Sequence, residues 1–185
     1  MKSENQKIPI HFPNGIELFI KREDLLHPVI SGNKFRKLKY NLAEAKRLGY
    51  KKLLTFGGAF PNHIVAVAGA GKEFGFETIG IIRGEELEEK IHENPSLAVA
   101  QQFGMKFFFV SRDAYRLKET PEFIAEMLSR FGDFYVLPEG GTNGLAIKGC
   151  EEILTESDSE FSYICTSVGT GGTISGIINS AASHQ

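Results

Sequence analysis

The sequence predicts an α/β protein with a largely parallel, doubly wound sheet. Segments rich in β-branched and aromatic residues alternate along the chain with segments whose apolar residues recur every three or four positions. Glycine-rich loops follow several predicted strands, and two predicted helices begin with a capping residue and a proline. Strands and helices in this order form βαβ units, whose strands pair in parallel. Ligands of such folds bind at the carboxyl ends of the strands, so we expect function in the loops there.

The first predicted units open the chain. A β-rich run covers residues 16–20, a helix covers residues 33–48 and a strand covers residues 52–56. The helix is predicted by apolar residues at spacings of three and four: Phe35, Leu38, Leu42, Ala45 and Leu48. Gly49 follows at the position where a glycine commonly ends a helix.

The same alternation continues through the rest of the chain. The helices that follow are expected over residues 62–74, from Asn94-Pro95 to Gly104, and from Thr120-Pro121 to Gly132. The strands that follow are expected over residues 78–82, 106–110, 134–137 and 163–167.

Composition and charge exclude several classes of function. The 185 residues carry 21 Lys and Arg against 23 Asp and Glu, a formal charge of −2, which gives no reason to expect a nucleic-acid or membrane partner. No stretch approaches the roughly 18 apolar residues of a membrane span, and the first ten residues lack the apolar run of a signal peptide, so a cytoplasmic location is the default expectation. Cys150 and Cys165 are spaced for neither a zinc site nor a redox pair, and we expect buried thiols.

Three strand-to-helix loops carry paired glycines: residues 55–63, 137–144 and 167–176. In the last, Gly169, Gly171 and Gly172 let the backbone approach a ligand, and Thr170 and Thr173 add hydroxyl groups at a helix N-terminus. This pattern predicts a phosphate site, with a tight turn that needs positive φ as the alternative. A Walker loop and a dinucleotide fingerprint are excluded because the chain has no Gly-Lys-Ser/Thr triplet and has Ile174 where the fingerprint needs a small residue.

Lys34 differs from the other lysines of the first predicted helix. Lysines 37, 39 and 46 fall on polar positions, where a solvated helix face is expected. Lys34 lies in the first turn, where the helix dipole disfavours a cation, and the neighbouring Arg36 and Lys37 should further favour its neutral amine. A neutral amine can attack an aldehyde, so Lys34 is a candidate nucleophile. The alternative interpretation is that Lys34 is an ordinary surface lysine. A reactive lysine together with a phosphate loop points to pyridoxal 5′-phosphate.

The motifs resemble those of pyridoxal-phosphate enzymes of fold type II, the tryptophan synthase β-like group. Within this group the chain is most similar to the 1-aminocyclopropane-1-carboxylate deaminase and D-cysteine desulfhydrase family. The matching segments run in the family's order along almost the whole chain: KRED (residues 21–24), SGNKFRKL (31–38), TFGGAFPNH (55–63), PEGGTN (138–143) and VGTGGT (168–173).

The resemblance implies roles for particular residues. Lys34 would form the internal aldimine and then move a proton of the substrate, a small amino acid. Asn62 would hydrogen-bond the cofactor's phenolic oxygen and contact the substrate. His63 would be either a partner of the substrate carboxylate or merely an exposed histidine at a helix start. The resemblance assigns the phosphate to Gly169, Thr170, Gly171, Gly172 and Thr173.

Two features depart from the family pattern. Pro61 stands where the family usually has a serine that contacts the substrate. Family members are also longer, so we expect an incomplete large domain in residues 1–36 and 144–185 around a small α/β domain in residues 37–143. The pyridine-nitrogen partner and the tyrosines of ring opening would then lie beyond Gln185.

Three functions therefore stay open at this level. The first is a pyridoxal-phosphate-dependent lyase or deaminase, a homodimer if the fold completes itself, whose amino-acid substrate the sequence does not identify. The second is a truncated, non-catalytic fragment or pseudoenzyme that at most binds the cofactor. The third is a generic phosphate-binding or nucleotide-binding module, which would leave the SGNK segment unexplained.

Overall fold

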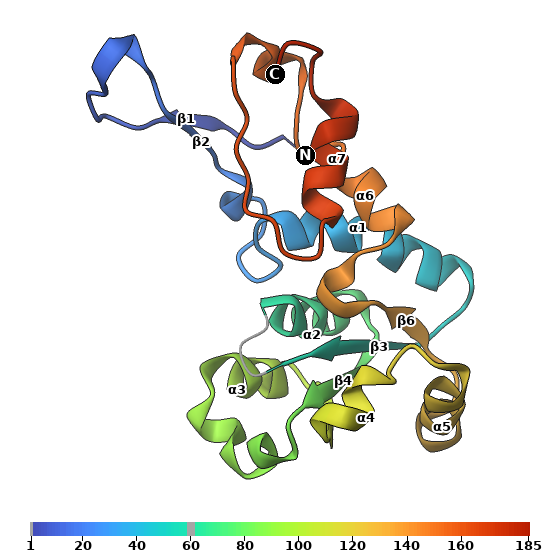
Figure 1. Ribbon diagram of the computed structural model, residues 1–185. Helices are drawn as coiled ribbons and strands as arrows, with labels where there is room; N and C mark the ends of the chain where they lie inside the picture. The colour runs from blue at the N-terminus through green and yellow to red at the C-terminus, as the bar shows by residue number, and fades with distance from the viewer. Residues whose placement is uncertain (1, 59–61) are drawn as a thin grey trace.

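The computed structural model describes residues 2–58 and 62–185. Figure 1 shows two parts joined at a waist. The lower part holds a parallel sheet with helices on both faces, and the upper part holds the first residues, the last helix and both termini. Helices α1 (Asn33–Arg47) and α6 (Gly144–Cys150) pack against each other and link the two parts.

The sheet of the lower part has four parallel strands in the order β5-β4-β3-β6. These strands are β3 (Lys52–Gly57), β4 (Glu77–Arg83), β5 (Lys106–Val110) and β6 (Tyr135–Leu137). The parallel sheet and all four strands were predicted from the sequence, to within one residue at each end. β3 and β4 lie in the centre, and their near-continuous apolar runs are buried on both faces, as a doubly wound sheet requires.

Two hydrophobic cores lie on opposite faces of this sheet. Successive residues of a strand point to opposite faces, so Leu53 enters the core under α2 (Asn62–Phe74) and α3 (Pro95–Gln102). Leu54 enters the core under α4 (Arg112–Arg116) and α5 (Pro121–Phe131). The doubly wound prediction is thus confirmed.

The predicted helix starts are confirmed by their capping hydrogen bonds. The Asn94 side chain accepts from the backbone N–H groups of Ser96 and Leu97, and the Thr120 hydroxyl accepts from the N–H of Phe123. Gly132 ends α5 with a φ of 69°, a conformation that favours glycine. Leu48, predicted to belong to the apolar face of α1, is instead 49% exposed because the helix ends one residue before it.

The upper part is less regular. β1 (Asn5–Lys7) and β2 (Phe19–Lys21) form an antiparallel pair, so the strand expected over residues 16–20 begins later than predicted. α7 (Gly172–Ser180) packs on α6. Short 3-10 helices complete the chain at Pro13–Gly15, Glu23–Leu25, Glu85–Glu93, Glu139–Gly141 and Glu156–Glu160.

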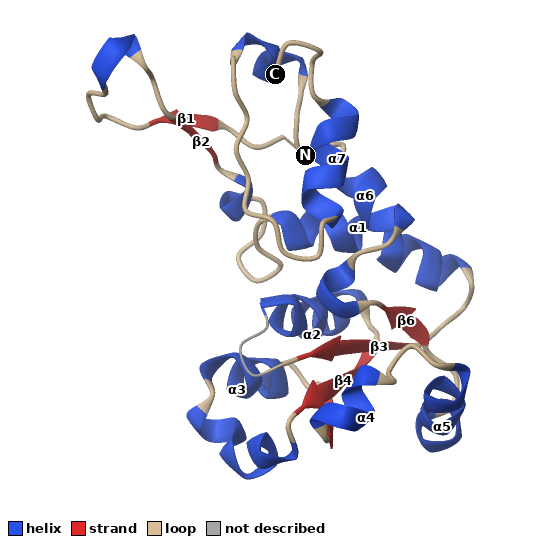
Figure 2. Cartoon of the chain, in the orientation of Figure 1, coloured by secondary structure: helices blue, strands red, loops and turns tan. Residues whose placement is uncertain are grey.

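The strand predicted over residues 163–167 does not form. This segment runs as an irregular connection between α6 and α7 in Figure 2, and Tyr163 is 87% exposed. Within the described residues, no backbone hydrogen bond joins residues 163–168 to another segment. A strand needs a neighbouring strand to pair with, and no described strand forms backbone hydrogen bonds with this segment.

Two largely buried ion pairs hold the upper part together. The Lys21 ammonium lies 2.8 Å from the Asp158 carboxylate and joins β2 to the C-terminal segment. Arg36 of α1 binds Glu23 at 2.9 Å.

No helix in the described part of the chain is long and apolar enough to cross a membrane. The domain boundaries expected at residues 36 and 143 stay a prediction.

Candidate active site

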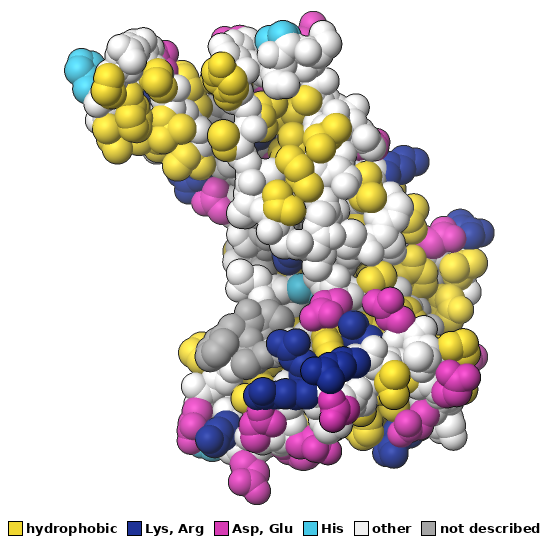
Figure 3. Space-filling view, in the orientation of Figure 1, with side chains coloured by type: hydrophobic (Ala, Val, Ile, Leu, Met, Phe, Trp, Pro, Cys, Tyr) yellow, Lys and Arg dark blue, Asp and Glu magenta, His cyan; other side chains and the backbone are white. Residues whose placement is uncertain are grey.

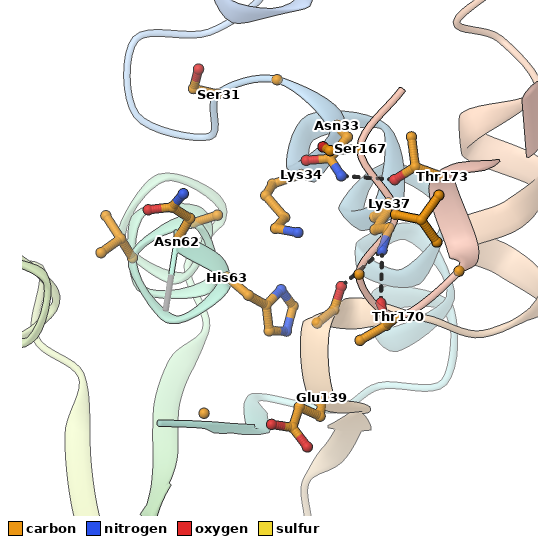
Figure 4. Close-up of a pocket in the computed structure, with 18 of the residues that line it drawn as sticks. Ser31, Asn33, Lys34, Lys37, Asn62, His63, Glu139, Ser167, Thr170 and Thr173 are labelled. Carbon is orange, nitrogen blue, oxygen red and sulfur yellow. Dashed lines mark hydrogen bonds between the residues drawn. The ribbon is translucent and has the colours of Figure 1, made fainter. Parts of the chain in front are cut away.

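A cavity of about 790 Å³ opens at the waist, between the carboxyl end of β3 and the N-termini of α1, α2 and α7 (Figure 4). Seven of the eight residues predicted for the site line it: Lys34, Asn62, His63, Gly169, Thr170, Gly171 and Thr173. Gly172, the eighth, is buried beside it as the first residue of α7. A Cβ at Gly172 would lie 2.8 Å from the Thr142 hydroxyl, so close packing requires glycine there.

Lys34 projects into this cavity from the first turn of α1. Gly32, with a φ of 62°, turns the chain into the helix just before it. In Figure 4 the Lys34 amine points toward His63. Burial lowers the pKa of Lys34, and the thiolate form of Cys150 partly opposes that shift. The direction agrees with the prediction, but burial is its main cause.

Lys37 was predicted to lie on a solvated helix face, and that prediction is wrong. Its side chain is only 2% exposed. Its ammonium donates to the carbonyl of Gly140 at 3.1 Å, to Thr142 Oγ1 at 3.0 Å and to Thr170 Oγ1 at 3.4 Å. Burial, followed by the charge of Lys34, lowers the pKa of Lys37 to about 8.

The reason for this error is that the partners of Lys37 lie more than a hundred positions further along the chain. Periodicity within α1 carries no information about which segment covers that helix. One local signal was present, because Lys34 and Lys37 are three residues apart and share a helix face. Because Lys34 was predicted to face a ligand, Lys37 on the same helix face could have been predicted to face that ligand too.

The glycine-rich loop leads directly into α7. Gly171 adopts a φ of 84°, which satisfies the tight-turn alternative at that position. Gly169 has no such conformation, and a Cβ at either glycine would meet no atom within 4 Å, so the loop faces open space. No side chain caps α7 within the described residues, which leaves the first backbone N–H groups of a nine-residue helix directed at the cavity. These groups, together with Lys37, suit a phosphate.

His63 is buried in the wall of the cavity, with 4% of its surface exposed. The alternative of an exposed histidine is therefore wrong. Its Nε2 lies 2.9 Å from Thr55 Oγ1, and the Thr55 hydroxyl donates its single proton to the carbonyl of Leu137 at 3.0 Å. Thr55 can then only accept from His63, which places the imidazole proton on Nε2. Burial and the charges of Lys34 and Lys37 lower the pKa of His63 to about 3, so the ring is neutral at physiological pH.

The other nitrogen of this ring, Nδ1, has no hydrogen-bond partner within the described residues. Since Nδ1 carries no proton in this tautomer, it is an acceptor. Buried acceptors without partners are rare in folded proteins, and one beside a cavity is available to a ligand that donates a hydrogen bond.

Asn62 and Glu139 also line the cavity, whereas the two cysteines do not. Asn62 begins α2 and is exposed to the cavity, whereas Pro61 lies outside the described residues. Glu139 lines the opposite side and binds Lys118 at 3.3 Å. Cys150 is buried as predicted, and burial raises the pKa of its thiol. Cys165 is exposed, contrary to prediction, because it belongs to the unpaired segment 163–168.

Comparison with known proteins gives consistent relatives. The model of the family described as pyridoxal-phosphate dependent enzyme matches residues 7–185. A putative 1-aminocyclopropane-1-carboxylate deaminase of Thermotoga maritima is 34% identical over 171 residues, which cover 88% of this chain and 53% of that protein. The mitochondrial bifunctional D-cysteine desulfhydrase/1-aminocyclopropane-1-carboxylate deaminase of Arabidopsis thaliana is 32% identical, with 91% of this chain and 47% of that protein covered. The chain spans about half the length of the curated relatives it matches.

Solved structures agree with these relatives. The crystal structure of an ACC deaminase homologue matches with a TM-score of 0.77 at 30% identity, over 97% of this chain and 56% of that one. A pyridoxal 5′-phosphate-dependent aspartate racemase matches with a TM-score of 0.70 at 17% identity, a likeness of fold alone.

Proposed function

Because the chain belongs to the family of pyridoxal-phosphate dependent enzymes, as its motifs predicted, we propose that the cavity at the waist binds this cofactor for a lyase or deaminase reaction. The substrate would be a small amino acid, with D-cysteine and 1-aminocyclopropane-1-carboxylate favoured by the names of the relatives. The observation that carries the proposal is the placement of the Lys34 amine in one cavity with the uncapped N-terminus of α7.

The described residues fit the two ends of the cofactor. Its phosphate would lie at residues 169–173, where free backbone N–H groups, the Thr170 and Thr173 hydroxyls and the Lys37 ammonium converge. Its aldehyde would be reached by Lys34, whose lowered pKa increases the share of reactive amine. Asn62 would contact the ring oxygen, the role given to it by the family resemblance.

When bound, pyridoxal phosphate supplies an aldehyde that joins to amines and a ring that withdraws electrons from the α-carbon of the substrate. The protein supplies positioning and proton transfer. Lys34 Nζ would take and return the proton of the substrate carbon once its amine is free. Lys37 would neutralise phosphate charge, which holds the opposite end of the ligand in place.

In this proposal, His63 does not bind the substrate carboxylate. A neutral ring with a bare Nδ1 has no proton to give to a carboxylate from that nitrogen. We therefore assign Nδ1 as the acceptor for a donor group of the substrate, such as its amino group or a side-chain hydroxyl or thiol. Thr55 and the carbonyl of Leu137 would fix the ring orientation.

The first experiment is titration of the purified chain with pyridoxal 5′-phosphate, followed by visible absorption. Wild type should gain a visible band, Lys34→Ala should not, and Lys46→Ala, an exposed lysine of the same helix, should behave as wild type. Lys37→Ala should keep the band but need about tenfold more cofactor, the loss expected for one charged hydrogen bond. A wild-type chain without a band would refute cofactor binding.

The second experiment separates an enzyme from a binding fragment. Release of ammonia from 1-aminocyclopropane-1-carboxylate, and of sulfide from D-cysteine, is measured on chain that shows the band. Turnover supports the enzyme, whereas a band without turnover supports the alternative of a non-catalytic cofactor-binding chain.

Two further expectations stay proposals. Light scattering on the cofactor-loaded protein tests the homodimer, and cell fractionation tests the cytoplasmic location.

A further inference from the structure

A second, strongly basic cavity lies on the sheet-bearing part of the molecule. It has a volume of about 380 Å³ and is lined by Arg83, Arg112, Tyr115 and Arg116. Figure 3 shows Lys and Arg side chains gathered on this face, near the end of β4 and over α4. The whole chain carries a formal charge of −2, so this concentration of positive charge is local.

The topology of the sheet brings these arginines together. Arg83 is the last residue of β4 and lies opposite Val110, the last residue of β5. The chain leaves β5 through Ser111 and begins α4 at Arg112, and Arg116 follows one helical turn later. Three guanidinium groups therefore meet at the carboxyl ends of two neighbouring parallel strands, where ligands of such sheets bind.

Existing ion pairs leave these cations available. Arg112 lies 3.0 Å from Glu86 and Arg116 lies 2.9 Å from Asp113, but all four side chains are more than half exposed. Exposed pairs of this kind contribute little, so a ligand replaces them at small cost. Arg83 has no carboxylate partner within the described residues.

Tyr115 forms the buried wall of this cavity. It is only 3% exposed, and its hydroxyl lies near the Glu139 carboxylate, with no hydrogen bond of ordinary geometry to any described residue. The Arg83 guanidinium lies 5.6 Å and the Lys118 ammonium 4.8 Å from the centre of its ring. Burial, followed by the charge and hydrogen bonding of the nearby Glu139 carboxylate, raises the pKa of Tyr115, so the hydroxyl keeps its proton.

We propose that Arg83, Arg112, Arg116 and Tyr115 form a binding site for a small multivalent oxyanion, a phosphate ester or a polycarboxylate. Planar guanidinium groups bind both carboxylate and phosphate oxygens in pairs, and the cavity volume lies within the range of small-molecule sites, about 300–1,000 Å³. The proposed pyridoxal-phosphate site is not required for this inference.

The two sites are neighbours. Nη2 of Arg83 lies 3.4 Å from the position that a Cβ would take at Gly58, and Gly58 lines the cavity at the waist. An anion held by Arg83 would therefore sit at the edge of the larger cavity.

The test is a titration of the ¹⁵N-labelled chain, without cofactor, followed by amide chemical shifts. Inorganic phosphate and citrate represent the two ligand chemistries, and sodium chloride at equal ionic strength is the control. We expect saturable shifts at Gly84 and residues 110–116 with one or both oxyanions, separate from any response at residues 169–173. Phosphate alone would identify a phosphate site, and citrate alone would identify a carboxylate site.

Matched variants test the residues themselves. Arg83→Gln and the pair Arg112→Gln with Arg116→Gln should each weaken binding at residues 110–116 by about tenfold or more. Arg47→Gln, which removes an exposed, ion-paired arginine of α1, should change nothing. Unchanged amide spectra outside the site would show that the variants fold. Shifts restricted to residues 169–173, an equal response to chloride, or unchanged affinity in folded Arg83→Gln would overturn the proposal.

Discussion

Replacing Lys37 by methionine removes an ammonium group from the junction between α1 and the C-terminal loop. The folded chain lowers the pKa of this lysine from 10.5 to about 8, chiefly by burial. At about 1.4 kcal/mol per pKa unit, the shift corresponds to a cost of about 3 kcal/mol for keeping the proton in the folded state. The side chain is only 2% exposed, so solvent does little to reduce this cost. The value is an upper limit because the hydrogen bonds of the ammonium oppose it.

The sign of the pH dependence follows from proton counting. Below pH 8 the lysine is protonated in both states, and the folded chain bears the full cost. Between pH 8 and 10.5 the unfolded chain holds one more proton than the folded chain, so this lysine makes stability rise with pH. Above that range its contribution is constant. The variant lacks this rise and should be more stable than wild type at pH 7, with an advantage that shrinks toward pH 10.5.

Urea unfolding followed by far-UV circular dichroism, from pH 7 to 10.5, measures this difference. Lys34 also has a lowered pKa, but it is present in both proteins and its contribution largely cancels. Lys46→Met, which changes an exposed lysine of the same helix, is the matched control and should follow wild type. A difference between wild type and Lys37→Met that does not vary with pH would refute the buried-cation argument.

Three further predictions concern packing and hydrogen bonding. Gly149→Ala should destabilise the chain by more than about 2 kcal/mol in urea unfolding, because the new Cβ would lie 2.0 Å from a backbone oxygen of α1. Gly144→Ala is the control: its Cβ would meet no atom within 4 Å, so the change should be tolerated. Thr55→Val should cost about 1–3 kcal/mol, because it leaves the Nε2–H of His63 buried without an acceptor, and ¹⁵N spectra of the ring should show loss of the single tautomer. Asn94→Ala should cost about 1 kcal/mol in the same unfolding assay through loss of the α3 cap, and equal stability would contradict the capping role.

Much of the sheet-bearing part could be predicted from the sequence because its signals are local. The caps at Asn94 and Thr120 act within three residues, and a buried parallel strand such as β4 is recognisable from its own apolar run. The family and its cofactor followed from short motifs that the comparisons match. The outcome for Lys37 and for residues 163–167 depended on distant partners, which periodicity does not report.

The site was predicted in the same uneven way. Lys34 and the glycine-rich loop could be recognised as candidate site residues from their residue types alone. The structure places them in one cavity. The protonation of His63 was not predictable, because it depends on a threonine of β3 and a carbonyl of β6 that meet only in the folded sheet. The basic cavity was missed because Arg83 ends β4 whereas its other lining residues belong to α4, which follows β5, and only the pairing of β4 with β5 brings them together.

The unpaired backbone of residues 163–168 has a practical consequence for handling the protein. Natural sheets protect exposed edges with lysines or prolines, but residues 161–183 contain no Asp, Glu, Lys, Arg or Pro. The unpaired backbone of residues 163–168 leaves N–H and C=O groups with which other extended chains can pair, so we expect the purified chain to aggregate with rising concentration. A lysine in place of Tyr163, which is already 87% exposed, is the change we would make first to keep the protein in solution.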